Sequence, residues 1–438
     1  MTSTKNYFKV LKLDEKIVFI SIILFPILLT TGPLMPDLIV ILCGIIFIYK
    51  FFKDKEFYNF LILNYKKEIF LFSTFFIIII LSLLNSSIIK NSFLSSFFYF
   101  RFFLFLLVVS YIFYKYPKTI KVLTISIITI LIVLFLDSLI QYYFEKNIFL
   151  QDVKKYTDLK YVTSFFGDEK RLGSFVARIL PICIALIFFV NNELINKYKI
   201  KELLILSSLI IIILSTERLA FFYFFVFIFF YFFTLNKKKK IFFSFSIIIL
   251  IIGVLNIFPN YLEKIYNTTI NQIYEKEKKI VQPLNLEWIK SSDKPLFFSR
   301  NHQNMILTSY YIFKENIFFG SGIKTFREEC KKERYKLTQR CSTHPHNTYL
   351  QLLSETGIFS FLFILFIFFF LLYENFKIIF KKNLSSYNHS ILISNTSLMI
   401  PIMPLVPSGS FYNNWICSLL FLSLTINIFI KKIKLIYT

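Results

Sequence analysis

Two of the chain's four histidines, His344 and His346, stand where a long polar segment meets an almost unbroken apolar run. A neutral imidazole can accept a proton from a hydroxyl group, which is the work of a general base. If a helix begins near Asn347, His346 lies at its positive end, where the neutral ring is favoured. The simpler alternative is that His346 only caps the helix and anchors it at an interface. His344 is a candidate for a supporting role.

Gly357 follows His346 by eleven residues, which is about three turns of an α-helix. The two residues would therefore share one helical face, with the titratable ring at the top and a notch beneath it at the glycine. We expect Asn347 and Gly357 to support the site that this face lines.

Arginines interrupt apolar stretches elsewhere in the chain. Arg171 and Arg178 bracket the start of one such stretch, and the pair Glu217-Arg218 interrupts another. A guanidinium group stays charged and binds phosphate oxygens in a bidentate manner, so these arginines predict a site for a diphosphate head group. Two alternatives remain open: Arg171 as an ordinary interfacial anchor, and Glu217-Arg218 as a turn cap.

Two further ionisable residues, Arg101 and Asp137, lie within predicted membrane spans at similar depths from the same surface. Charged residues in a membrane are costly and are usually paired or functional. Arg101 and Asp137 could form a structural ion pair with each other, or either could contact a ligand directly.

The elements that must position these residues are membrane helices. The chain has 438 residues, 56% of them hydrophobic, with a mean hydropathy of +0.63. We predict an all-α polytopic membrane protein, because apolar runs near ~20 residues are typical of membrane spans. About twelve spans are expected, near residues 17–35, 36–52, 69–86, 93–114, 119–142, 172–191, 203–216, 217–234, 241–258, 347–373, 390–409 and 412–430.

The net charge of +24 would suggest nucleic-acid binding in a soluble protein. Here most lysines fall in short loops between alternate spans, which places those loops and both termini in the cytoplasm. Residues 1–258 would form nine membrane helices, 259–346 a large outer loop subdomain, and 347–438 three more helices. A second outer segment is Glu145–Arg171. Within the large loop we expect a helix at His302–Lys314, followed by a turn at Ile317–Gly322 into another short helix.

Cys330 and Cys341 lie in the large loop shortly before His346. On the outer face of a bacterial inner membrane such a pair is exposed to oxidising conditions, so we predict a disulfide that holds this part of the loop. Two free thiols are the alternative. No metal site is expected, because the cysteines lack Cys-x-x-Cys spacing, and no phosphate-binding glycine loop is present.

The sequence as a whole resembles the O-antigen ligase and O-antigen polymerase superfamily. The likeness rests on a large outer loop, then His346-Asn347, and Gly357 after nine further residues. Ser360 stands where the ligase pattern has Gly, Thr or Tyr. Further blocks of the family are matched in the same order by residues 137–141, 171–175, 215–218 and 319–322.

The resemblance implies a GT-C-like membrane glycosyltransferase that needs no metal, nucleotide or other cofactor. It would move a glycan from undecaprenyl diphosphate to a sugar hydroxyl of lipid A–core at the periplasmic face of the inner membrane. The resemblance makes His346 the catalytic base. It assigns Arg218, with Arg178 or Arg171, to the diphosphate. We then expect the face from His346 to Gly357 to form one wall of this site, with Gly357 leaving room for the prenyl chain.

Three other functions remain open from the sequence. An O-antigen polymerase would use the same donor and join lipid-linked repeat units, and a relative could glycosylate protein. A transporter of lipid-linked sugar would also have about twelve spans. A transporter would be expected to place its charges near the membrane midplane and to show symmetry between its halves. The clustering of charges toward one face therefore favours an enzyme.

Overall fold

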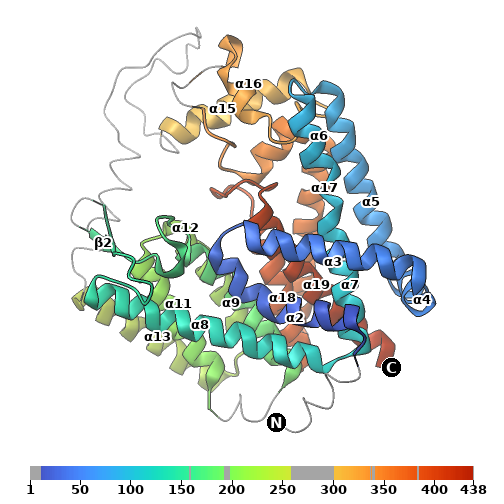
Figure 1. Ribbon diagram of the computed structural model, residues 1–438. Coiled ribbons are helices and arrows are strands. Elements are labelled where there is room, and N and C mark those ends of the chain that lie inside the picture. Colours follow the sequence, from blue (N-terminus) through green and yellow to red (C-terminus); the bar gives the residue numbers. More distant parts are fainter. Residues whose placement is uncertain are drawn as a thin grey trace.

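The computed structural model describes residues 11–156, 159–191, 198–257, 300–335, 337, 341–381 and 384–437. Within these residues the fold is helical apart from one short hairpin, which confirms the all-α prediction (Figure 1). Seven helical segments are long and apolar enough to cross a membrane: α3 (Leu34–Lys53), α5 with η2 (Lys66–Asn85), α6 with α7 (Ile89–Lys115), α8 (Lys118–Phe144), α9 (Leu172–Val190), α17 (Thr348–Ile379) and Asn414–Ile433 of α19. The protein is therefore a multi-pass membrane protein.

The remaining predicted spans fall on α2 (Leu13–Leu28), α11 (Ile200–Ser215), α12 (Arg218–Phe232), α13 (Lys237–Ile257) and α18 (Ser386–Met399). Four of these helices have only 14 to 16 residues, whereas a bilayer core requires about 20. The count of twelve spans and the sidedness of the termini therefore stay predictions.

The centre of the bundle is α9, which packs against α18, α11, α12 and α8. Nearly every residue of α9 from Leu172 to Phe188 is buried, as expected of a helix that is apolar on all sides. Its neighbour α18 presents small polar residues that allow a close approach: the Ser390 hydroxyl donates to the Ala185 carbonyl at 2.8 Å, and the Ser386 hydroxyl donates to the Phe188 carbonyl at 2.6 Å.

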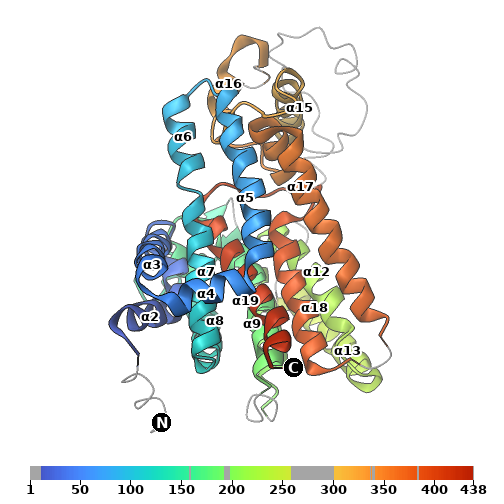
Figure 2. The same cartoon turned by 90° about the vertical axis from the view of Figure 1, so that its right-hand side faces the viewer.

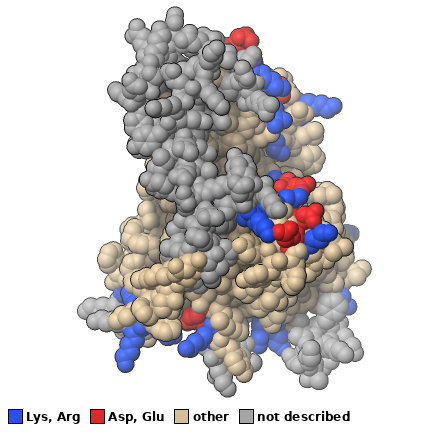
Figure 3. All heavy atoms as spheres, turned by 90° about the vertical axis from the view of Figure 1, so that its left-hand side faces the viewer, with Lys and Arg blue, Asp and Glu red and all other residues tan. Residues whose placement is uncertain are grey.

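Charged side chains are unevenly distributed over the surface. On the face shown in Figure 3, uncharged side chains lie between the charged side chains at the bottom and a mixed patch above. Figure 2 shows α15 and α16 at one end of the molecule and the end of α19 at the other. An uncharged band between two polar ends is the surface that a bilayer requires.

The segment after α8 forms a hairpin that the sequence did not indicate. Strands β1 (Lys154–Tyr156) and β2 (Leu159–Tyr161) pair antiparallel, with Lys154 opposite Tyr161. The short helix η3 (Ser164–Phe166) then leads into α9. This segment corresponds to the predicted outer segment between the fifth and sixth spans.

The described part of the large loop is a small helical layer. It contains α15 (Arg300–Glu315), α16 (Phe326–Lys331) and η5 (Glu333–Tyr335), which confirms the predicted helix, turn and second short helix. Ile312, Phe326, Cys330 and Tyr335 form its own small core. Residues 259–299, 336 and 338–340 of the predicted loop subdomain lie outside the described residues.

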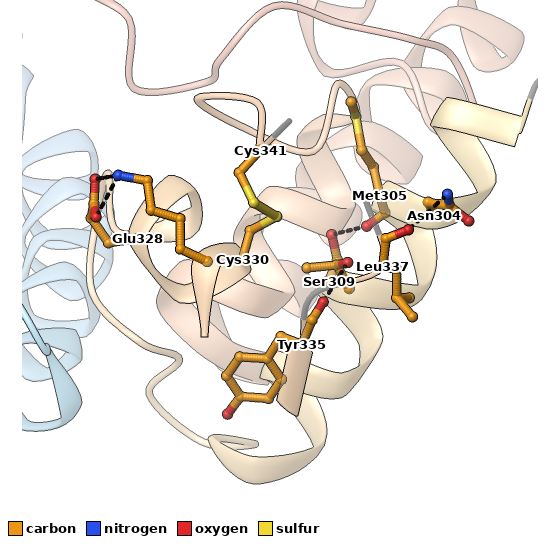
Figure 4. Close-up of a disulfide and its surroundings, with 10 residues drawn as sticks. Asn304, Met305, Ser309, Glu328, Cys330, Tyr335, Leu337 and Cys341 are labelled. Carbon is orange, nitrogen blue, oxygen red and sulfur yellow. Dashed lines mark hydrogen bonds and ion pairs between the residues drawn. A yellow bond between two sulfur atoms is a disulfide. The ribbon is translucent and has the colours of Figure 1, made fainter. Parts of the chain in front are cut away.

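The predicted disulfide between Cys330 and Cys341 is present, with a Cα–Cα separation of 5.8 Å (Figure 4). Nearby, the Thr308 hydroxyl donates to the Tyr335 carbonyl at 3.1 Å, and the Asn304 amide donates to the Leu337 carbonyl at 3.1 Å. The disulfide joins α16 to the loop segment that leads toward His346, and the two hydrogen bonds fasten α15 to Tyr335 and Leu337.

Candidate active site

The start of α17 fixes the position of His346. Asn347 is the N-cap residue, and its side-chain oxygen accepts hydrogen bonds from the backbone N–H groups of Tyr349 and Leu350 at 2.9 and 3.1 Å. His346 has a positive φ of 54°, and its carbonyl accepts from the Ser408 N–H at 2.8 Å. The predicted helix start is therefore confirmed, and the backbone turns sharply immediately before it.

Three of the four histidines gather at this point. The ring centroids of His344 and His346 are 4.3 Å apart, and those of His302 and His346 are 6.0 Å apart. His302 comes from α15 in the loop layer, so the cluster joins two separate elements. Sequence reasoning included His344 and His346 but missed His302, because only the packing of α15 on α17 brings it close.

The ring nitrogens of His344 and His346 have different surroundings. His344 Nε2 lies 3.3 Å from the Ser408 carbonyl, and His344 Nδ1 lies 2.9 Å from the Thr343 hydroxyl. A carbonyl oxygen only accepts, so the proton of a neutral His344 belongs on Nε2. His346 Nε2 lies 3.0 Å from the Ser342 hydroxyl. Within the described part of the chain, His346 Nδ1 makes no hydrogen bond.

The cluster holds its imidazoles in the neutral form. Burial lowers the pKa of His346, and the neighbouring His302 lowers that pKa further. Burial also lowers the pKa of His344, to about 4, with a contribution from His346. The pKa of His302 is lowered first by burial and then by the positive charge of Arg218. The lowered pKa of His346 agrees with the expected neutral ring, and burial is the main cause of the lower pKa.

Gly357 does not leave an open notch beneath His346. Its φ of 76° and ψ of −172° interrupt the helical geometry of α17. A Cβ atom there would stand 2.1 Å from the Phe318 carbonyl oxygen, because the loop backbone fills this space. The expectation that the glycine leaves room for a prenyl chain is therefore wrong. The glycine instead admits the backbone of the loop layer.

Polar groups around Gly357 hold the loop layer on α17. The N–H groups of Ser321 and Gly322 donate to the Ser354 and Glu355 carbonyls at 2.9 and 2.8 Å. The buried Glu355 carboxylate also accepts from the Phe326 N–H at 3.3 Å. This contact between the loop layer and α17 was not apparent from the sequence, because the first half of α17 resembles an ordinary amphipathic helix.

Arg178 is a buried guanidinium without a carboxylate partner among the described residues. Its side chain is 5% exposed, and one amino group donates to the Ser174 carbonyl at 2.9 Å. The guanidinium carbon lies 4.8 Å from the centre of the Tyr223 ring on α12. Its buried Nε–H has no hydrogen-bond partner. A buried cation with an unused donor is suited to an anionic ligand.

The other candidate arginines have different environments. Arg171 is the N-cap residue of α9, is about one-third exposed, and pairs with Glu169 at 2.7 Å. This exposed pair favours the interpretation of Arg171 as an interfacial anchor. Arg218 is the first residue of α12 and acts electrostatically on His302. Of the two alternatives near α9, the geometry therefore favours Arg178 over Arg171.

Glu217 joins the start of α12 to the start of α9. Its carboxylate accepts hydrogen bonds from the N–H groups of Gly173 and Ser174 at 2.7 and 3.0 Å, and from the Ser174 hydroxyl at 2.5 Å. A carboxylate at this position complements the positive end of α9. Glu217 therefore fixes Arg218 on one helix relative to Arg178 on the other.

Arg101 and Asp137 do not form an ion pair with each other. Arg101 pairs with Asp37 of α3, with its amino group 2.8 Å from the carboxylate. Asp137 accepts hydrogen bonds from the Ile148 N–H at 2.9 Å and from the Ser164 hydroxyl. The suggested pairing is therefore wrong. Asp137 holds the segment after α8, whereas Arg101 holds α3.

Similarity to known proteins supports the interpretation of this geometry. A family model described as O-antigen ligase matches residues 203–365. This match covers less than half of the chain, and it makes residues 203–365 similar to O-antigen ligase. No curated protein matches the chain at a significant level.

The matched O-antigen ligase region contains most of the candidate site. Glu217, Arg218 and the whole histidine cluster fall within it, as do Gly357 and the disulfide. Arg178 lies outside the region but is connected to it through Tyr223. No group of three His, Cys, Asp or Glu side chains in the described ranges has the arrangement of a metal site. The protein is therefore a multi-pass membrane protein whose residues 203–365 are similar to O-antigen ligase.

Proposed function

We propose that the protein is an O-antigen ligase. It transfers a glycan from undecaprenyl diphosphate to a sugar hydroxyl of lipid A–core at the periplasmic face of the bacterial inner membrane. The observation that carries this proposal is the histidine cluster. It favours a neutral His346, leaves its Nδ1 without a hydrogen-bond partner among the described residues, and lies within the region that matches the O-antigen ligase family model.

The donor diphosphate binds at the start of α9 and α12. Arg178 offers the unused Nε–H, and Arg218 contributes a second guanidinium at the N-terminus of its helix. Both groups stay charged at every relevant pH. They hold the pyrophosphate oxygens and stabilise the negative charge that develops when the glycan leaves.

The acceptor approaches from the side of His346. The oxygen of an acceptor hydroxyl attacks the anomeric carbon of the glycan while the bond from that carbon to the diphosphate oxygen breaks. The hydroxyl proton passes to Nδ1 of His346, and undecaprenyl diphosphate departs with both bonding electrons. A base positioned in this way contributes typically about 10²–10⁴-fold to the rate.

A purified preparation tests the donor and acceptor together. The protein in detergent is mixed with an undecaprenyl-diphosphate-linked oligosaccharide and with purified lipid A–core, and the products are separated by gel electrophoresis and mass spectrometry. The proposal predicts oligosaccharide attached to lipid A–core and released undecaprenyl diphosphate. Lengthened lipid-linked glycan without any lipid A–core product would instead identify a polymerase. An absence of both products would exclude either transfer.

Deleting the gene provides the cellular counterpart. Loss of all O-antigen from lipid A, with polymer retained on the lipid carrier, supports a ligase. A single repeat on the core indicates a polymerase, and glycan lost from protein alone indicates a protein glycosyltransferase. A donor trapped on the cytoplasmic side would indicate a transporter.

A further inference from the structure

His302 interacts with both parts of the proposed site, the base His346 and the diphosphate ligand Arg218. On one side its ring lies 6.0 Å from that of His346, and on the other it experiences the charge of Arg218 at the start of α12. His302 is itself half-buried on α15.

The packing of the loop layer fixes the backbone that carries His302. Helix α15 packs along α17, and the bonds from Asn304 and Thr308 fasten it to the loop on its other side. The disulfide from Cys330 to Cys341 closes the same layer shortly before His346. Fixed backbones on both sides therefore keep the two rings together.

We propose that His302 is a positioning residue for acceptor activation, which orients His346 and keeps its ring available as a base. This inference rests on the proposed function, in which His346 accepts the proton of the acceptor hydroxyl. A proton on either ring disfavours a proton on the other, because two like charges at this separation repel. Arg218 biases His302 itself against protonation.

The groups that face His346 are few within the described residues. His302 approaches from α15, His344 from the adjoining loop, and the charge of Arg218 acts through its effect on His302. The segment at residues 403–413 also packs against the cluster, and its sequence contains no Asp, Glu, Lys, Arg or His. Changes at His302 should therefore appear directly in the titration of His346.

The test measures that titration independently of catalysis. Diethyl pyrocarbonate reacts with neutral imidazole, so the rate at which it modifies the peptide that contains His346 can be followed by mass spectrometry from pH 4 to 8. His302→Gln removes a titratable neighbour and should move the midpoint for His346 upward by about half a pH unit. His302→Lys places a permanent charge there and should move the midpoint downward by about one unit.

The matched control is the remaining histidine, His389, which lies on α18 beside Phe188 and away from the cluster. His389→Gln should leave the midpoint of His346 unchanged. Opposite shifts from the two His302 variants support the inference, because a loss of packing alone would move both variants in the same direction. Equal midpoints, or shifts of the same sign, would overturn it.

A transfer assay separates this inference from the proposed function. The acid limb of glycan transfer should follow the His346 midpoint in each variant, and the half-unit shift in His302→Gln should reduce transfer about threefold on that acid limb. If the midpoints shift as expected but His346→Ala transfers glycan at the full rate, the proposed base is wrong and the coupling of the rings stands. If His346→Ala is inactive but the midpoints do not shift, the role of His302 is wrong.

Discussion

Replacing Gly357 with alanine should release the loop layer from α17. The backbone at Gly357 has φ 76° and ψ −172°, a region that is essentially restricted to glycine and costs other residues on the order of 1–3 kcal/mol. The added Cβ would also stand 2.1 Å from the Phe318 carbonyl oxygen. That distance is far inside van der Waals contact, so one of the two backbones must move.

The movement would break the bonds that join the two segments. Three backbone hydrogen bonds cross this contact, with lengths of 2.8 to 2.9 Å, from the N–H groups of Ser321, Gly322 and Ile358. Each contributes about 1 kcal/mol. Strain and lost bonds together give a local destabilisation of about 4–6 kcal/mol, which raises the population of the detached state roughly a thousandfold or more.

Two measurements on the purified protein in detergent check this prediction. Hydrogen exchange should become faster in residues 317–326 and at the start of α17, and glycan transfer should fall at least about tenfold because α15 carries His302 away from His346. Gly253→Ala in α13 is the control, since no atom lies within 4 Å of its added Cβ. Unchanged exchange and transfer in Gly357→Ala would refute the reasoning.

Three further predictions concern Arg178, the disulfide and the Arg101 ion pair. Arg178→Gln should reduce glycan transfer about a hundredfold or more. Arg171→Gln, at the one-third-exposed residue, should reduce transfer less than about threefold. Equal losses in the two variants would contradict the choice of Arg178. Cys341→Ser removes the disulfide and should lower the stability of the loop layer by about 3 kcal/mol. Proteolysis of the loop layer should therefore be faster, and a proteolysis rate equal to that of the oxidised parent would contradict the prediction. Arg101 and Asp37 are only 14% and 17% exposed. A double-mutant cycle on the free energy of unfolding should therefore give a coupling energy of about 1 kcal/mol or more. Strictly additive effects of the two substitutions would argue against the ion pair.

Much of the fold could be predicted because it depends on local patterns. Apolar runs mark membrane helices wherever they occur, and each predicted span falls on a helix of the structure. The helix start at Asn347 and the helix in the large loop are likewise local signals. Apolar runs alone do not fix the number of spans, because helices such as α11 and α12 are shorter than a bilayer is thick.

The tertiary contacts of the site could not be predicted in the same way. The partner of Arg101 is Asp37 on a distant helix, and similar depth alone suggested Asp137 instead. His302 joins the cluster only because α15 packs on α17. Gly357 suggested an empty notch, whereas the space belongs to the Phe318 backbone. Each case depends on which segments meet in space, and periodicity carries no such information.

The central claim is that His346 removes the proton of the acceptor hydroxyl. It is tested most directly by comparing His346→Gln with the parent protein for both donor binding and glycan transfer at pH 7. We predict that binding of the undecaprenyl-diphosphate-linked oligosaccharide changes less than about threefold, while transfer to lipid A–core falls about a hundredfold or more. Transfer within about threefold of the parent rate, at equal donor binding, would contradict the claim.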